Sequence, residues 1–257
     1  MTKDKRLVAA LACRNQGTRL YGKPLQNLDV NAGVKVIDNI INCLSSVESI
    51  DEIVLGISKD KSNMDFIDYS KDLSIPYIIG DEIDVLERLI QCGESQDATD
   101  ILRVTSESPF PSYDLIDLAW QKHIKYSADA TMLDHIVDGC GFEIITLDAL
   151  RTSHSRGQAK HKSELCSLFI RENLDKFKVQ RVDCPDELKR EDLRLTVDNP
   201  EDLIVCKAVY KEFIKDAPQI PINKIIKFLD MNHSLKELIF PFTEKGYESM
   251  YVWSDNE

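Results

Sequence analysis

Short apolar runs alternate with segments of helical periodicity along the first half of the chain. Four runs of about five apolar residues predict buried strands, at residues 7–11, 53–57, 75–79 and 101–105. Apolar positions at helical spacing predict helices at residues 34–47, 64–73, 84–92 and 112–123. Strands that alternate with helices of about ten residues are typical of a mainly parallel sheet with helices on both faces. The pattern therefore predicts an α/β fold.

The second half of the chain departs from this simple alternation. It predicts strands at residues 142–147, 179–182 and 193–197, and helices at 148–152, 165–173, 201–214, 222–230 and 235–239. Asn199 and Pro200 mark the start of one helix, because proline is favoured in a first turn. The polar, basic stretch 153–162 is expected to be a mobile loop. No linker or repeat separates these elements, so we expect one domain over residues 1–240 and a polar C-terminal tail over 241–257.

Composition and charge narrow the function classes. The 257 residues are 43% hydrophobic and 30% charged, which is typical of a soluble globular protein. The net charge of -12 argues against nucleic acid or an anionic membrane as the partner, because both require an extended basic surface. The seven cysteines are scattered, which indicates free thiols in a reducing compartment. With no signal peptide and no apolar stretch of about 20 residues, the sequence predicts a cytoplasmic protein.

A basic loop follows the first predicted strand. It contains Arg14, Arg19 and Lys23 together with Gly17 and Gly22. Glycine lets the backbone approach a ligand closely, and backbone N–H groups with three cations can cradle a polyanion such as a nucleoside triphosphate. The spacing matches neither the P-loop nor G-x-G-x-x-G. The alternative is a solvated basic turn, because charge runs usually face solvent.

Five segments, in order, resemble one enzyme family. Residues 12–25 are A-C-R-N-Q-G-T-R-L-Y-G-K-P-L, where the family has A-R-x-x-S-T-R-L-P-G-K-P-L. Residues 80–88, 102–110, 164–177 and 193–203 are similar to its segments G-S-E-D-D-V-L-x-R, V-R-V-T-G-D-C-P-L, E-H-V-T-P-Y-I-x-E-N-P-x-K-F and R-L-T-V-D-x-P-E-D-L. The family is that of the spore-coat polysaccharide cytidylyltransferases, which are sugar nucleotidyltransferases related to the CMP-Kdo and CMP-sialate synthetases. The resemblance implies a single-domain GT-A-like (Rossmann-like) fold, with a mixed, mainly parallel sheet flanked by helices.

The resemblance also implies an activity. In the family, a sugar hydroxyl attacks the α-phosphate of CTP, so that CMP is transferred and pyrophosphate leaves. We therefore expect a Mg²⁺-dependent cytidylyltransferase that acts on an acidic sugar for surface glycans, as a homodimer. Glu107 and Asp198 match the family's two acidic positions and would hold the Mg²⁺, which lowers the pKa of the attacking hydroxyl. Lys23 is the third expected catalytic residue and would grip the triphosphate.

The remaining site residues follow from the same resemblance. The nucleotide is expected to contact Ala12, Arg14, Gly17, Thr18, Arg19, Lys23, Arg88, Thr105 and Ser106. The sugar is expected to contact Glu143 and Glu164. Structural alternatives stay open for both acidic positions. Asp198 would serve as an N-cap of the following helix, and Glu107 would be a surface acid before a proline turn.

The chain departs from the family pattern at several positions. Ser106 and Glu107 replace Gly-Asp, and the longer carboxylate matters because Mg²⁺ demands strict geometry. Gly141 stands where the family tends to have Asp, Tyr21 replaces a proline, and residues 165–167 replace H-V-T. Because two of these changes lie on the sugar side, the acceptor does not follow from the family. The alternatives are a guanylyl- or uridylyltransferase that acts on a sugar phosphate, and a non-catalytic nucleotide-binding homologue.

Overall fold

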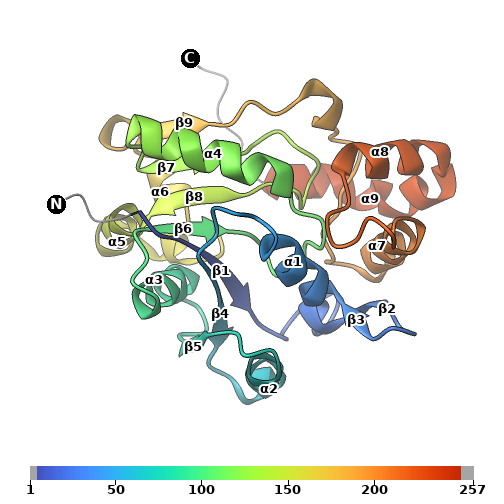
Figure 1. Ribbon diagram of the computed structural model, residues 1–257, viewed down its shortest axis with the longest axis horizontal. Helices are drawn as coiled ribbons and strands as arrows, with labels where there is room; N and C mark the ends of the chain where they lie inside the picture. Colours follow the sequence, from blue (N-terminus) through green and yellow to red (C-terminus); the bar gives the residue numbers. More distant parts are fainter. Residues whose placement is uncertain (1–4, 250–257) are drawn as a thin grey trace.

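The computed structural model describes residues 5–249, with side chains up to residue 244. Its centre is a seven-stranded sheet in the order β5-β4-β1-β6-β8-β7-β9 (Figure 1). In that order the strands span Tyr77–Gly80, Glu52–Ser58, Leu7–Cys13, Asp100–Arg103, Glu143–Thr146, Ala130–Met132 and Val179–Arg181. β5, β4, β1 and β6 are parallel, β8 is antiparallel to both β6 and β7, and β9 is parallel to β7. The predicted α/β fold with a mixed, mainly parallel sheet is confirmed.

Helices cover both faces of the sheet, which explains the unbroken apolar run of β1. They are α1 (Val36–Leu44), α2 (Met64–Asp72), α3 (Val85–Ser95), α4 (Tyr113–Tyr126), α5 (Leu147–Arg156), α6 (Leu168–Arg171), α7 (Pro200–Glu212), α8 (Ile222–Met231) and α9 (His233–Ser249). Leu7, Ala9 and Leu11 of β1 belong to one core with α1, α2 and α4, and Val8 and Ala10 belong to another core with α3 and α5. A strand buried on both faces carries apolar residues at consecutive positions.

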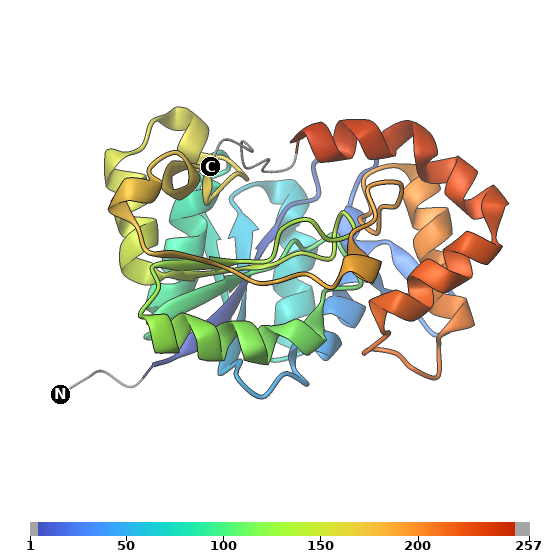
Figure 2. The same ribbon diagram turned by 90° about the horizontal axis from the view of Figure 1, so that it is seen from above.

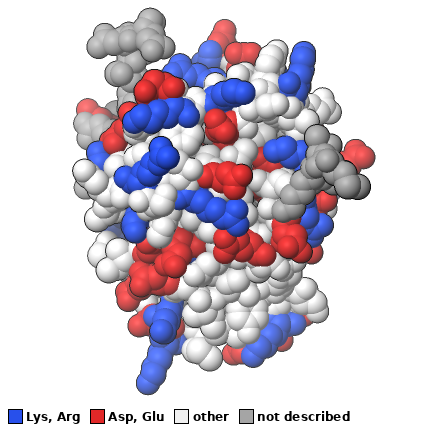
Figure 3. All heavy atoms as spheres, turned by 90° about the vertical axis from the view of Figure 1, so that its left-hand side faces the viewer, with Lys and Arg blue, Asp and Glu red and all other residues white. Residues whose placement is uncertain are grey.

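Two groups of helices lie at opposite ends of the molecule. α3 and α5 lie together at one end, and α7, α8 and α9 lie together at the other, in both Figure 1 and Figure 2. Figure 3 faces the end that carries α3 and α5, where basic and acidic side chains are interspersed. One ion pair between these two helices joins Arg151 to Glu94 at 2.8 Å.

The predicted strand at residues 193–197 is wrong. In the described part of the chain, Arg194 makes an isolated bridge to Asp138, and the segment joins no strand ladder. Leu193, Leu195 and Val197 are nevertheless buried in the core. The apolar positions that suggested a strand therefore reflect packing rather than strand pairing.

Other elements differ in extent. The short strand β7 and the hairpin of β2 (Asn27–Asp29) and β3 (Val34–Lys35) were not predicted. The expected loop 153–162 is largely helical, because α5 continues to Arg156 and a 3-10 turn spans Ala159–Lys162. α9 runs past the predicted helix end at residue 239. Residues 250–257 of the expected tail lie outside the described residues, and the division at residue 240 stays a prediction.

Two global properties complete the description. Within residues 5–249, no helix combines the length and the apolar character that crossing a membrane requires. All seven cysteines are buried and unpaired. Burial raises the pKa of the Cys13 thiol beyond its ordinary range, which keeps this thiol at the end of β1 protonated and unreactive.

Candidate active site

The basic loop after β1 is anchored near its start by Asn15, which directly follows the first cation of the loop, Arg14. The buried Asn15 donates its backbone N–H to Asn63 Oδ1 (2.7 Å) and its side-chain Nδ2–H to the backbone oxygen of Ser62 (2.5 Å). Gly22, with φ at +60°, donates its N–H to Asn15 O at 2.8 Å. At Gly17, an added Cβ would lie 2.3 Å from a backbone oxygen of the same loop. The loop conformation therefore depends on both glycines.

The carboxylate of Asp198 contacts cationic side chains of this loop, although Asp198 lies far from the loop in sequence. Lys23 Nζ is 2.5 Å from Asp198 Oδ1, and Arg19 contacts the same oxygen at 3.1 Å. Arg194 contacts the other oxygen, Oδ2, at 2.7 Å. Burial alone would raise the pKa of Asp198, but Lys23, Arg19 and Arg194 hold it below its ordinary value. The carboxylate is thus ionised and surrounded by positive charge.

Glu107 completes this cluster from the segment that follows β6. Burial raises its pKa above the ordinary value, Lys23 opposes the rise, and the nearby Asp198 adds to it. The backbone N–H of Val197 donates to Glu107 O at 2.9 Å, which ties the two acidic segments together. The structure therefore brings Glu107, Asp198 and Lys23 close together, and their catalytic roles stay predictions. Asp198, however, follows an extended loop and not a strand end.

Ser106, at the departure from the family pattern, is part of the same edge. Its hydroxyl lies 2.8 Å from the backbone oxygen of Ala12 at the end of β1, and 3.1 Å from Glu107 Oε2. Thr105 donates its hydroxyl to Ser108 Oγ at 2.6 Å. Thr18 is exposed in the basic loop. These predicted nucleotide contacts lie on the loops that follow β1 and β6, where open α/β sheets bind ligands.

Arg194 is a site residue that sequence reasoning did not single out. Its side chain is 3% exposed, its Nε lies 3.1 Å from Asp202 Oδ1 and 3.9 Å from Asp138 Oδ2, and its NH1 donates to the backbone oxygen of Phe242 at 2.8 Å. Asp202 accepts from the backbone N–H of Asp198 at 3.0 Å. Arg194 therefore holds the carboxylate of Asp198 in position from the buried side. Its position four residues before Asp198 was the available signal.

Arg88 has buried donors without acceptors. The residue is 1% exposed, and its Nε and NH1 have no hydrogen-bond partner among the described residues. Burial lowers the pKa of Arg88, which Cys13 opposes and Arg14 reinforces, so the guanidinium lies near the end of β1. Gly80 makes room for it, because a Cβ there would lie 2.6 Å from Arg88 Cγ. Unsatisfied buried donors are costly, and an acceptor from a ligand would satisfy them.

The two predicted sugar contacts differ in character. Glu143 is buried and pairs with Arg103 at 3.1 Å and with Arg171 at 2.9 Å, and it accepts from Ser167 Oγ. Burial would raise the pKa of Glu143, but the two arginines hold it below its ordinary value. Glu164 is exposed and pairs with Arg14 at 3.3 Å. The structure therefore places Glu143 in a buried ion-pair network that the sequence did not predict.

The donor set beside the basic loop fits Mg²⁺. Mg²⁺ is usually held by one or two carboxylates, with phosphate oxygens and water in the other positions. Burial is the main cause of the raised pKa of Glu107, and a divalent cation bound by Glu107 and Asp198 would offset the smaller contribution from repulsion by Asp198. Both oxygens of Asp198 contact cationic side chains. A metal ion at Asp198 Oδ1 would therefore compete with Lys23 and Arg19 for this oxygen.

A second group of ligand-type side chains lies at the start of α3. One atom each of Asp84, Glu87 and His154 lies within 4.8 Å of the others. Asp84 accepts from the backbone N–H of Glu87 at 2.9 Å and lies 2.8 Å from His154 Nε2 and 3.7 Å from Lys162 Nζ. A helix cap and two ion pairs explain this group, so we assign no metal ion to it.

The chain has the α/β fold of known nucleotidyltransferases. The structure superimposes on a cytidylyltransferase from Leptospira borgpetersenii serovar Hardjo-bovis with a TM-score of 0.81, at 17% identity over 97% of this chain and 100% of that one. It also superimposes on a CMP:2-keto-3-deoxy-manno-octonic acid synthetase complexed with CTP, with a TM-score of 0.62, at 13% identity over 81% of this chain and 100% of that one.

Sequence comparison gives two relatives along nearly the whole chain. The spore coat polysaccharide biosynthesis protein SpsF of Bacillus subtilis is 25% identical over 86% of this chain and 93% of its own length. An uncharacterized protein of Methanocaldococcus jannaschii is 26% identical over 95% of this chain and 99% of its own length. No family model matches the chain. The resemblance to the cytidylyltransferase family that the five segments predict is confirmed by these likenesses in sequence and fold.

Proposed function

We propose that the chain transfers CMP from CTP to a sugar hydroxyl and releases pyrophosphate. The observation that carries the proposal is the cluster of Lys23, Arg19 and Arg194 around Asp198, with Glu107 beside it. The names of the relatives support the same chemistry, since they include a cytidylyltransferase and a CMP-sugar synthetase complexed with CTP. SpsF supports a role in polysaccharide synthesis.

The residues of the cluster have separate roles in the proposed reaction. The sugar oxygen forms a bond to the α-phosphorus, the bond from that phosphorus to the β-phosphate oxygen breaks, and the hydroxyl proton passes to water. Lys23 and Arg19 bind the β- and γ-phosphates and neutralise the charge that develops on the leaving pyrophosphate. Glu107 and Asp198 would hold Mg²⁺, which supplies charge on the α-phosphate and lowers the pKa of the attacking hydroxyl.

Binding of the triphosphate would change which side chains contact Asp198. Lys23 and Arg19 contact one oxygen of this carboxylate, whereas the buried Arg194 contacts the other. When the two loop cations transfer to the phosphates, Asp198 Oδ1 becomes available and Arg194 still fixes the carboxylate. The nucleotide also offers acceptors to the unpartnered donors of Arg88. Nucleotide and metal ion should therefore bind cooperatively.

The experiment that tests this proposal measures both binding and turnover. Thermal stabilisation is recorded with CTP, GTP, UTP and ATP, each with and without Mg²⁺, and pyrophosphate release is then followed with acidic sugars and sugar phosphates. We expect a shift of several degrees that is largest with CTP and Mg²⁺. A shift and turnover with GTP or UTP alone would favour the guanylyl- or uridylyltransferase. Binding of CTP without turnover of any sugar would favour the non-catalytic homologue.

The acidic sugar, the cytoplasmic location and the homodimer stay predictions. The burial of Glu143 affects the prediction about the sugar, because Glu143 was expected to contact it. Both of its carboxylate oxygens contact arginine side chains, so it would orient Arg103 and Arg171 rather than receive a sugar hydroxyl directly. We therefore propose that recognition of the acceptor depends on other side chains.

A further inference from the structure

Each of the three cations in the basic loop contacts a carboxylate of the same chain. Lys23 and Arg19 contact Asp198. Arg14 contacts Glu164 instead, with its NH2 at 3.3 Å from Oε2, and it has no other hydrogen bond or ion pair among the described residues. Glu164 thus neutralises the cation at the start of the loop.

The segment that carries Glu164 also reaches the proposed metal site. Residues 163–167 connect the 3-10 turn at Ala159–Lys162 to α6 and form no strand. Burial is the main cause of the raised pKa of Glu107, and the charge of Glu164 adds to it. Glu164 therefore lies within electrostatic reach of both Arg14 and Glu107.

Arg103, the last residue of β6, anchors the backbone of Glu164. Its NH2 donates to Glu164 O at 2.8 Å, and its NH1 donates to Glu143 Oε2 at 3.1 Å. Glu143 is buried and is held in turn by Arg171 at 2.9 Å. Because a guanidinium is planar and its donors point in fixed directions, the contact with Glu143 also fixes the direction of the donor to Glu164. The carboxylate that meets Arg14 thus extends from an anchored backbone.

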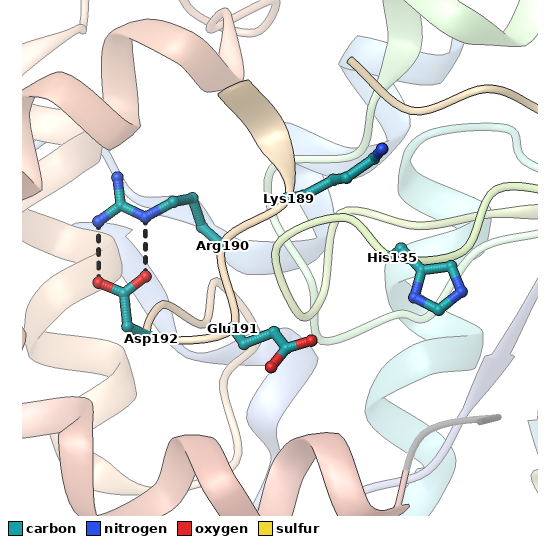
Figure 4. Close-up of a pocket in the computed structure, with 5 residues that line it drawn as sticks. All are labelled: His135, Lys189, Arg190, Glu191 and Asp192. Carbon is teal, nitrogen blue, oxygen red and sulfur yellow. Dashed lines mark hydrogen bonds and ion pairs between the residues drawn. The ribbon is translucent and has the colours of Figure 1, made fainter. Parts of the chain in front are cut away.

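The contact between Arg14 and Glu164 is one that an anion can displace. The two side chains are 51% and 70% exposed, and exposed ion pairs contribute little to stability. Arg190 gives the contrast: in the pocket shown in Figure 4, its guanidinium faces Asp192 with contacts of 2.7 and 2.8 Å. Bidentate pairs of that kind are strong. A ligand anion would therefore replace Glu164 at Arg14 more readily than Asp192 at Arg190.

We propose that Glu164 competes with the phosphates of the nucleotide for Arg14, and that Arg103 is the positioning residue that keeps Glu164 in place for this exchange. The inference rests on the proposed nucleotidyl transfer. A triphosphate that binds takes Arg14 from Glu164. After the transfer, Glu164 returns to Arg14 and favours the release of pyrophosphate. Glu164 therefore weakens the binding of substrate and of this product alike, in exchange for easier product release.

The test measures the affinity of the full chain for CTP, CMP and inorganic pyrophosphate, each with Mg²⁺, by titration calorimetry. The variants are Glu164→Gln, Arg103→Lys and the two combined. Glu164→Gln removes the charge and keeps the shape of the side chain. Arg103→Lys keeps a positive charge beside Glu143 but replaces the planar fork by a single ammonium group.

Two control variants lie at the opposite edge of the sheet. Glu48 is exposed and precedes β4, so Glu48→Gln removes the same charge far from the basic loop. Arg6 precedes β1 and, like Arg103, donates to a backbone oxygen, that of Gln96 at 2.8 Å. Arg6→Lys is therefore the matched control for Arg103→Lys.

We expect Glu164→Gln to bind CTP and pyrophosphate about threefold to fivefold more tightly, on the scale of an exposed ion pair, and to bind CMP with unchanged affinity. Arg103→Lys should shift the CTP and pyrophosphate affinities in the same direction. The combined variant should gain no more than Glu164→Gln alone, because both changes act on one contact. Neither control variant should show a gain.

Several results would overturn the inference. They are an unchanged or lower affinity of Glu164→Gln for CTP and pyrophosphate, an equal gain for CMP, or an equal gain in Glu48→Gln. Additive effects in the combined variant, or a loss of affinity for all three probes in Arg103→Lys alone, would overturn the positioning role of Arg103. If the unmodified chain binds pyrophosphate but not CTP, the proposed function fails, and the pyrophosphate titrations still test the exchange at Arg14.

Discussion

Asp138 provides a sharp test of the electrostatics behind the catalytic cluster. Its side chain is 14% exposed and lies 3.9 Å from Arg194 Nε. Burial raises the pKa of Asp138 from 3.8 to about 6, Arg194 opposes the rise, and the carboxylates of Asp198 and Asp202 add to it. The folded protein therefore holds this carboxylate in its charged form at neutral pH against a free-energy cost.

The size of that cost follows from linkage between pKa and stability. A difference of one pKa unit corresponds to about 1.4 kcal/mol, so a pKa of about 6 in place of 3.8 corresponds to about 3 kcal/mol. Because the pKa is higher in the folded state, the loss of stability develops as pH rises from about 4 to about 6 and is complete above that range. Asparagine at position 138 has nearly the same shape and carries no charge.

We expect Asp138→Asn to raise the free energy of unfolding by up to about 3 kcal/mol at pH 7 and to change it little near pH 4. The assay is urea denaturation of both proteins across this pH range. Asp68→Asn, at an exposed position of α2, is the control and should show no such pH-dependent gain. An Asp138→Asn protein that is less stable than the unmodified chain at pH 7 would refute the reasoning, because the contact with Arg194 would then outweigh the burial of charge.

Further predictions concern the loop and the buried arginine. Lys23→Ala and Asp198→Asn should each reduce pyrophosphate release at least about 100-fold with the fold retained, while the exposed Lys59→Ala should not; full activity of either variant would contradict the assigned roles. Arg88→Met should stabilise the free protein by about 1–3 kcal/mol and abolish stabilisation by CTP in the same thermal assay, so an unchanged CTP response would exclude Arg88 from the site. Gly17→Ala should weaken CTP binding about tenfold or more without loss of secondary structure by circular dichroism, because the added Cβ would lie 2.3 Å from a loop oxygen; unchanged affinity would show that the loop rearranges freely.

The fold was predictable from the sequence where a buried apolar segment is also a paired strand. β1 is apolar at consecutive positions because both of its faces are covered, and its prediction as a buried strand is confirmed. Residues 193–197 alternate apolar and polar side chains, as a strand with one buried face would, but they pack in the core without a strand ladder. A pattern of hydrophobic residues indicates that a segment is buried. Whether the segment pairs as a strand depends on which other segments of the chain lie beside it. β7 is the sequence Ala-Thr-Met, which contains no apolar run of the kind that predicts a buried strand.

The site was predictable only as far as its residues lie in recognisable segments. The sequence analysis named Arg19, Lys23 and Asp198, which the structure brings together. It recognised the segment that contains Arg194 but gave this residue no role, because its role follows from long-range contacts with Asp202, Asp198 and the backbone of residue 242. Nor did it predict that Glu143 forms ion pairs with Arg103 and Arg171. No local sequence pattern shows which charged side chains pair across a sheet.

The pair Ser106–Glu107 bears most directly on the choice between an enzyme and a non-catalytic homologue. The family pattern of Gly-Asp would place a shorter carboxylate here, and a longer one is a conflict for a metal ion with strict geometry. The Ser106 hydroxyl lies within 3.1 Å of Glu107 Oε2 and within 2.8 Å of the end of β1, so it restrains the longer side chain. Glu107 also remains within electrostatic reach of Lys23 and Asp198. Ser106 therefore holds the side chain of Glu107 at this edge of the sheet, an arrangement compatible with the proposed metal site.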